Sequence, residues 1–173
     1  MRPLRGEILP CHLPWSVSLS GSFIKVMQEE EAAEIIVEAT VNRLDETEDE
    51  LRPARVRLLF RSGIRIATHD LGASGRFEPE KHFDASALEA TWRRVQADPS
   101  GRLQQWRRLG VSEWSNVYEV KRSIWDGEPL APPWRHFVLA GSELWLEVLA
   151  RSWRWVCCNH EGQPIGEATE YQG

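Results

Sequence analysis

The chain has 173 residues, of which 42% are hydrophobic and 27% are charged. These proportions exclude a fibrous or wholly disordered chain, and the length suits one hydrophobic core, so we predict a single domain over residues 1–173. No apolar run approaches the roughly 18 residues that cross a bilayer, and no apolar secretion signal follows Met1. Membrane insertion and export are therefore not expected, and the net charge of −5 disfavours nucleic acid as a partner.

The cysteines indicate the redox compartment of the protein, and the tryptophans indicate where aromatic side chains are expected. Besides Cys11 there are Cys157 and Cys158, which are adjacent, and a disulfide between neighbours would be badly strained. We therefore expect reduced thiols and a cytoplasmic protein. Nine tryptophans are unusual for this length, and because this side chain is costly to expose, they are expected in a core or at a binding surface.

The first half of the chain predicts antiparallel strands. Residues 16–27 indicate one bent strand or two short ones, and 34–41 alternate apolar and polar side chains, as a half-buried strand does. The acidic stretch 45–50 has no apolar residue and predicts a solvated loop. Residues 54–61 alternate again, with arginines on the polar face, so pairing with 34–41 would place opposite charges across the sheet.

A helical pattern replaces the alternation over residues 85–109, where we predict about two helices. Ser86 and Glu89 have capping-box spacing, and Leu88, Trp92 and Val95 recur every three or four residues. A second short helix is expected after the interruption at 98–101.

The C-terminal half returns to strands. Residues 117–120 predict a strand, 126–133 a proline-rich loop, and 136–140 with 144–150 a hairpin whose type II′ turn uses Gly141 and Ser142. Another strand is predicted from Trp153 to Cys158. The fold class is therefore α+β and mainly antiparallel β: a curved sheet, a sandwich or a partly closed barrel.

Candidate groups for catalysis or metal binding lack the spacing that such chemistry needs. His69, His82 and His136 are candidate general bases, but no nucleophile motif accompanies them. Cys157, Cys158 and His160 have zinc-type ligand chemistry, yet adjacent cysteines on a strand point to opposite faces. We therefore assign no catalytic residue, metal or cofactor, which favours a protein that is not an enzyme.

The aromatic residues of the last strands are the predicted binding residues. Alternation puts Trp145, Glu147 and Leu149 on one face of their strand, and Trp153 and Trp155 on one face of the next. If the three tryptophans line one concave surface, they could hold a flat ligand or a partner's side chains. The alternative, which we favour, is that both faces are buried, one by helices and one by a second sheet.

From these patterns the leading hypothesis is a non-catalytic cytoplasmic protein that binds a protein partner, such as an accessory or toxin-neutralising protein. The alternative hypothesis is a small-molecule pocket, with or without enzymatic activity, in which His136 or Glu147 lies near the mouth of a tryptophan-lined cavity. A metal-dependent hydrolase is the third hypothesis. The sequence predicts neither the oligomeric state nor the identity of a partner.

Overall fold

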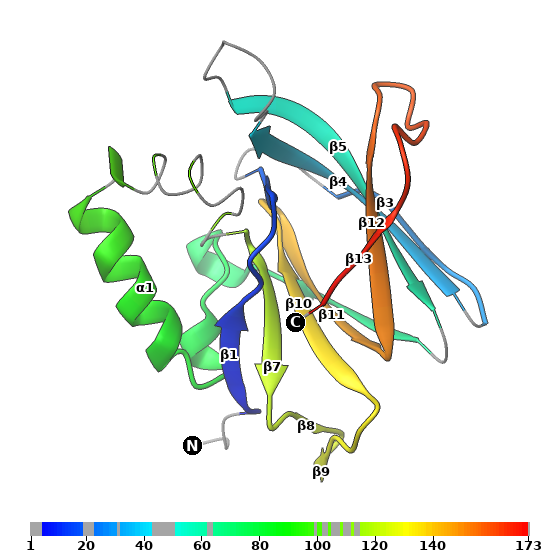
Figure 1. Cartoon of the computed structure of the whole chain (residues 1–173). Coiled ribbons are helices and arrows are strands. Elements are labelled where there is room, and N and C mark those ends of the chain that lie inside the picture. The colour runs from blue at the N-terminus through cyan, green and yellow to red at the C-terminus, as the bar shows by residue number, and fades with distance from the viewer. Residues whose placement is uncertain are drawn as a thin grey trace.

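The protein folds into two antiparallel sheets that face each other (Figure 1). This computed structural model describes residues 5–18, 23–30, 32–42, 51–61, 64–98, 100–101, 104, 108, 112 and 115–172. The predicted acidic loop at 45–50 and most of the predicted second helix lie outside the described residues. Among the described residues, no helix is long and apolar enough to span a bilayer.

Within the described residues, the first sheet has five strands and the second has six. In spatial order the first sheet contains β1 (Glu7–Pro10), β7 (Val117–Lys121), β10 (Arg135–Ala140), β11 (Leu144–Ala150) and β6 (Arg65–Asp70). The second sheet contains β13 (Thr169–Glu170), β12 (Ser152–Cys158), β5 (Leu51–Arg61), β4 (Ala32–Asn42) and β2 (Trp15–Val17), with β3 (Phe23–Gln28) also paired to β4. A separate hairpin joins β8 (Ile124–Trp125) to β9 (Glu128–Pro129). The predicted mainly antiparallel β fold is confirmed.

The main core fills the space between the sheets. Alternation on β4 and β5 sends Ile35, Val37, Leu58 and Phe60 inward, where all four are buried. From the first sheet, side chains such as that of Phe137 meet them. The charges predicted to face each other do so, since Glu38 lies opposite Arg55 in the register and Arg57 Nε lies 3.7 Å from a Glu34 carboxylate oxygen. We call the core side of the first sheet its inner face and the opposite side its outer face.

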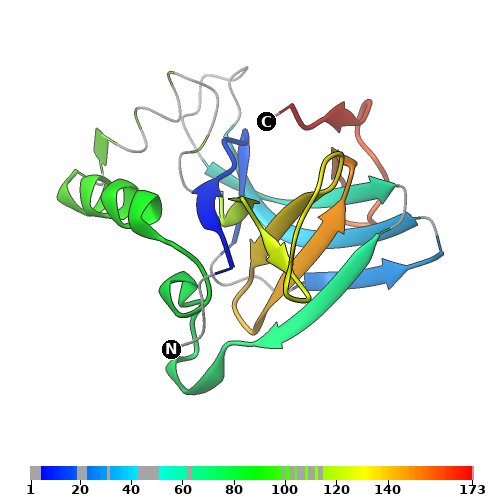
Figure 2. The same cartoon turned by 90° about the horizontal axis from the view of Figure 1, so that it is seen from below.

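Helix α1 (Ser86–Ala97) lies beside β1 at the edge of the first sheet, away from the second sheet (Figure 2). Leu88 and Val95 are buried, whereas Trp92, at the margin of the same stripe, is 42% exposed. The predicted capping box is wrong, because the helix begins at Ser86 and no side chain caps Ala85. Instead the Asp84 carboxylate accepts hydrogen bonds from the backbone N–H and the hydroxyl of Ser86. Two 3₁₀ turns, η1 (Gly72–Ser74) and η2 (Pro79–Lys81), precede the helix.

The β10–β11 hairpin is confirmed, but its predicted turn is displaced by one residue. Ala140 pairs with Trp145, and the backbone N–H of Gly141 donates to the Leu144 carbonyl. The two turn residues are therefore 142 and 143, and Gly141 does not have a positive φ. The reason for glycine is space, because a Cβ at Gly141 would lie 2.6 Å from the ring of Phe23 on β3.

Gly141→Ala should lower the free energy of unfolding by about 1–3 kcal/mol, the usual cost of overpacking a close contact. Urea denaturation followed by circular dichroism measures the change. Adding Phe23→Leu, which shortens the opposing ring, should recover part of the loss. A wild-type midpoint for Gly141→Ala would contradict the packing argument.

Candidate functional site

The outer face of the first sheet carries the chemically distinctive side chains of the protein. On β11, Trp145, Glu147 and Leu149 share this face, as the alternation predicted. The β11–β6 register places His69 opposite Trp145, and Arg65 opposite Leu149. Polar and aromatic groups from two strands therefore lie along one continuous surface, which other segments cover.

Glu147 is the buried charge of this face. Its side chain is 1% exposed, and Arg5, which precedes β1, contacts both of its oxygens. Arg5 Nη2 lies 2.5 Å from Oε1, and Arg5 Nη1 donates to Oε2 over 3.0 Å. This guanidinium compensates the desolvation of the carboxylate, whereas an unpaired charge there would destabilise the fold by several kcal/mol.

Two imidazoles approach the same carboxylate. His69 Nε2 lies 3.3 Å from Oε1 of Glu147, and His136 Nε2 lies 3.4 Å from Oε2. The other nitrogen of His136, Nδ1, is 2.7 Å from the Ser123 hydroxyl. With its hydrogen on Nε2, a neutral His136 faces the carboxylate with a donor and accepts a hydrogen bond from Ser123 at Nδ1. We call Arg5, His69, Ser123, His136 and Glu147 the Glu147 cluster.

Burial and charge set the pKa values in this region. Burial acts to raise the pKa of Glu147, but the contact with His136 and the charge of Arg5 outweigh it, so that the pKa lies below its ordinary value. Burial lowers the pKa of His69, with Arg5 adding to the decrease and Glu147 opposing it. Burial followed by the charge of Arg5 also lowers the pKa of His82. His69 and His82 therefore stay neutral down to a lower pH than they would in an unfolded chain.

Serine, histidine and glutamate in contact resemble a nucleophilic triad in composition, but not in access or charge. Ser123 is 3% exposed and His136 is fully buried, so the hydroxyl does not face solvent. Glu147 is already neutralised by Arg5, which reduces its ability to stabilise an imidazolium. Nor is a metal indicated, because no group of three His, Cys, Asp or Glu side chains in the described part of the chain is arranged to hold one. The contacts of the cluster support a positioning role.

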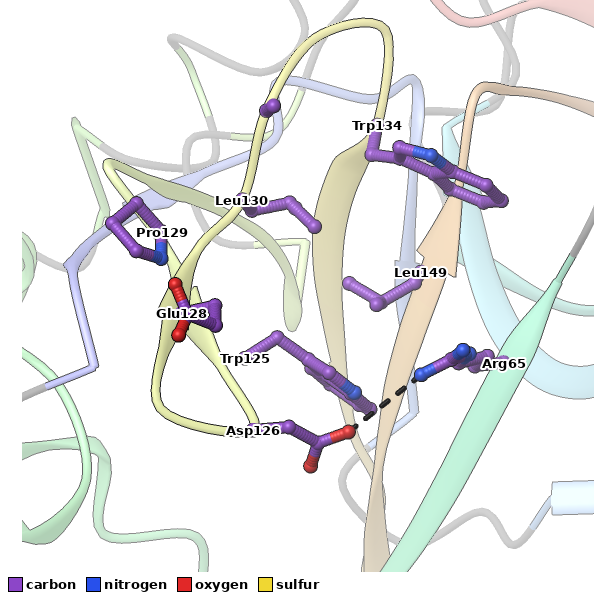
Figure 3. A pocket seen from close by; sticks show the side chains of 9 residues that line it. Arg65, Trp125, Asp126, Glu128, Pro129, Leu130, Trp134 and Leu149 are labelled. Carbon is purple, nitrogen blue, oxygen red and sulfur yellow. Dashed lines mark ion pairs between the residues drawn. The ribbon is translucent and has the colours of Figure 1, made fainter.

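A pocket of about 440 Å³ lies next to the cluster on the outer face. In Figure 3 the rings of Trp125 and Trp134 lie on either side of Leu130 and Leu149. Pro129 and Ala131 complete the apolar lining. The ring of Trp125 also meets the buried ring of His136 edge to face, with centroids 5.2 Å apart. Trp125 therefore separates the pocket from the Glu147 cluster.

The polar side chains of the pocket are Arg65, Asp126 and Glu128. Arg65 and Asp126 form an ion pair of 3.6 Å between two exposed side chains, drawn dashed in Figure 3. Asp126 and Gly127 have φ values of 52° and 84°, as the two central residues of a type I′ turn require. This turn closes the β8–β9 hairpin and brings Trp125 and Glu128 to the same pocket.

The structure brings some of the predicted site residues together and separates others. Trp145, His136 and Glu147 all lie on the outer face, but they are buried, so neither His136 nor Glu147 lies at the mouth of a cavity. Trp145 stacks on His69 at 4.0 Å and lines a smaller hollow of about 180 Å³ with His82. Trp153 belongs to the core between the sheets. The favoured alternative, in which both faces are covered, describes these tryptophans better than one concave surface does.

Trp155 packs against the core between the sheets and contacts Trp15, with ring centroids 6.0 Å apart. Trp125 and Trp134, which do line a pocket, were not among the predicted site residues. One local signal could have found the hairpin that carries Trp125: the Asp-Gly pair is the preferred type I′ turn sequence. The prediction of a proline-rich loop over 126–133 misses this hairpin.

Comparisons of the chain with protein-family models, with curated proteins and with solved structures found no match. The arguments for function therefore rest on the geometry of the pocket and of the Glu147 cluster.

Acid should destabilise the protein through His69, because a group with a lowered folded-state pKa favours folding above its unfolded value and disfavours it as the pH falls. The free energy of unfolding should decrease below about pH 6.5. As the pH is lowered below this value, the urea midpoint of unfolding should fall less steeply for His69→Gln than for wild type. Parallel curves would show that His69 does not contribute to the pH dependence.

Proposed function

We propose that this protein is a non-catalytic binding protein whose ligand is a small molecule held between Trp125 and Trp134. The observation that carries the proposal is the pocket itself, with a volume of about 440 Å³ and two indole rings across an apolar floor. Small-molecule sites typically span 300–1,000 Å³ and combine an apolar lining with a few polar groups. The pocket has both properties.

The lining suggests the chemistry of the ligand. Tryptophan faces favour a flat or aliphatic body, and burial of such a surface supplies most of the binding free energy. Arg65, Asp126 and Glu128 offer both a cation and carboxylates to a polar substituent. The expected ligand therefore has an apolar ring or chain and at least one hydrogen-bonding or charged group.

The burial of the other candidate residues favours this proposal over the leading sequence-based hypothesis. Trp145 and Trp153 are 3% and 2% exposed, so neither is available to a protein partner on the surface of the folded chain.

Cys11, Cys157 and Cys158 are free thiols, which suits the cytoplasmic location that we propose. Burial raises the pKa of Cys11 to about 12, so this thiol stays protonated and unreactive at neutral pH.

Trp125→Ala and Trp134→Ala should each weaken binding about tenfold or more, since each removes one aromatic wall. Fragments that raise the melting temperature of wild-type protein supply the ligands, and isothermal titration calorimetry measures their affinity. Trp92→Ala removes a part-exposed indole from α1, outside the pocket, and should leave the affinity unchanged. Fragments whose affinity is indifferent to both pocket variants would contradict the proposal.

A second candidate function, binding of a protein partner, is favoured by the edge strand β3. This strand pairs only with β4 among the described strands, and Val26 and Met27 on it are 42% and 40% exposed. An open strand edge with apolar side chains can accept an additional strand from another chain.

Met27→Lys should abolish co-purification of a partner that adds a strand here, because a charged side chain discourages pairing at a sheet edge. Affinity purification followed by native mass spectrometry measures the stoichiometry of the complex. Trp134→Ala is the matched control and should keep the partner. The reverse pattern, with the partner lost only in Trp134→Ala, would assign partner binding to the pocket.

A further inference from the structure

The β8–β9 hairpin, which carries Trp125 into the pocket, has few contacts of its own. It contains two residue pairs, Ile124 with Pro129 and Trp125 with Glu128. At its base the backbone N–H of Leu130 donates to the Ser123 carbonyl over 2.8 Å. So short a hairpin is not stable by itself, and its position therefore depends on contacts with the rest of the protein.

Two chains of contacts connect this hairpin to the Glu147 carboxylate. In the first, the Arg5 side chain binds Glu147 while the Arg5 backbone carbonyl accepts a hydrogen bond from the Ile124 N–H over 3.1 Å. In the second, His136 lies between Glu147 and the hairpin, where it contacts the Ser123 hydroxyl and the Trp125 ring. Both chains begin at one carboxylate and reach neighbouring residues of β8, Ile124 in the first and Trp125 in the second, and Trp125 lines the pocket.

We propose that Glu147 is the positioning residue of the pocket, and that adding a proton to the Glu147 cluster displaces Trp125 and weakens ligand binding. The effect on binding rests on the proposed function, but the displacement of Trp125 does not.

The charge balance of the cluster explains why a proton matters. The charged or titratable groups that face Glu147 are Arg5 before β1, His69 on β6 and His136 on β10, and His82 lies nearby, with its ring 5.0 Å from that of Trp145. With neutral imidazoles, one guanidinium and one carboxylate cancel. A proton on an imidazole adds a second positive charge beside Arg5, around a carboxylate that is itself buried from solvent.

Protonation also changes the contact at the base of the hairpin. A neutral His136 with its hydrogen on Nε2 accepts a hydrogen bond from the Ser123 hydroxyl. An imidazolium carries hydrogens on both nitrogens, so the Ser123 hydroxyl must turn and become the acceptor. Because Ser123 directly precedes β8, this rearrangement acts on the segment that holds Trp125.

Fluorine NMR of the full chain labelled with 5-fluorotryptophan tests the displacement without any ligand. Trp125→Phe assigns the Trp125 resonance. Between about pH 8 and pH 5, the range in which histidines titrate, this resonance should move, as should that of Trp145, whose ring stacks on His69. The resonance of Trp155, which packs near Trp15 in the other sheet, should stay constant.

Glu147→Gln separates positioning from general stability. It should displace the Trp125 resonance already at neutral pH and flatten its titration. The matched control is Glu119→Gln, because the 6% exposed Glu119 is likewise paired with an arginine, accepting hydrogen bonds from Arg135 at 2.9 and 2.8 Å with Lys121 also 2.9 Å away, but on the inner face of the same sheet. Glu119→Gln should lose stability and keep the wild-type Trp125 resonance and titration.

If Glu147→Gln does not fold, Ser123→Ala provides a second test, because this variant retains the buried ion pair of Arg5 and Glu147. It removes the hydroxyl that His136 contacts and should alter the pH dependence of the Trp125 resonance while leaving that of Trp145 in place. A Trp125 resonance that does not titrate in wild type, or that responds equally to Glu119→Gln and Glu147→Gln, would overturn the inference.

The affinity of the best fragment, measured by calorimetry at both ends of this pH range, connects the displacement to function. It should fall about tenfold or more in acid for wild type, equivalent to about 1.4 kcal/mol, and should be low at both pH values for Glu147→Gln. If Trp125 titrates as expected but Trp125→Ala and Trp134→Ala both leave fragment binding unchanged, the proposed function is wrong and the positioning of Trp125 by Glu147 stands.

Discussion

Burial of the Glu147 carboxylate is the constraint on which the outer face of the first sheet depends. A carboxylate at 1% exposure requires a partner, and the partner is a guanidinium from the segment before β1. Arg5 can reach it because β1 pairs with β7 and its flanking backbone binds that of His82, Asp84 and Ile124. One buried charge thus helps to hold together the N-terminal segment, the turn before α1 and the base of the β8–β9 hairpin.

The two faces of the first sheet serve different purposes. The inner face contributes apolar side chains such as Phe137 and Leu146 to the core between the sheets, and their burial supplies most of the stability. The outer face buries a second apolar cluster, which includes Val120 and Val138, and beside it carries the Glu147 cluster, whose charged groups are satisfied by specific partners. The pocket lies on this second face, where the ring of Trp125 contacts His136 of the Glu147 cluster.

The local sequence pattern predicted the main strands of the sheets, but it did not predict the cap of the helix or the turn of the hairpin. The alternation over 34–41 and 54–61 predicted β4, β5 and their facing charges, since side-chain direction in a strand follows from the backbone period of two. The capping prediction at Ser86 failed because Asp84 supplies the oxygen atom instead. The turn prediction at Gly141 failed because a glycine is required there by the close approach of the Phe23 ring and not by a positive φ.

For the candidate site too, the sequence predicted the direction of side chains but not their neighbours in space. Alternation alone determined that Trp145 and Glu147 share a face, but it left open whether Trp153 joins them, and the tertiary structure places Trp153 in the core between the sheets. What covers each face was decided only by the tertiary structure, because Arg5 and Glu147 are 142 residues apart in sequence. Likewise, Arg65 comes to the pocket only through the pairing of β6 with β11. Periodicity fixes the direction of a side chain, whereas its neighbours depend on how distant segments pack together.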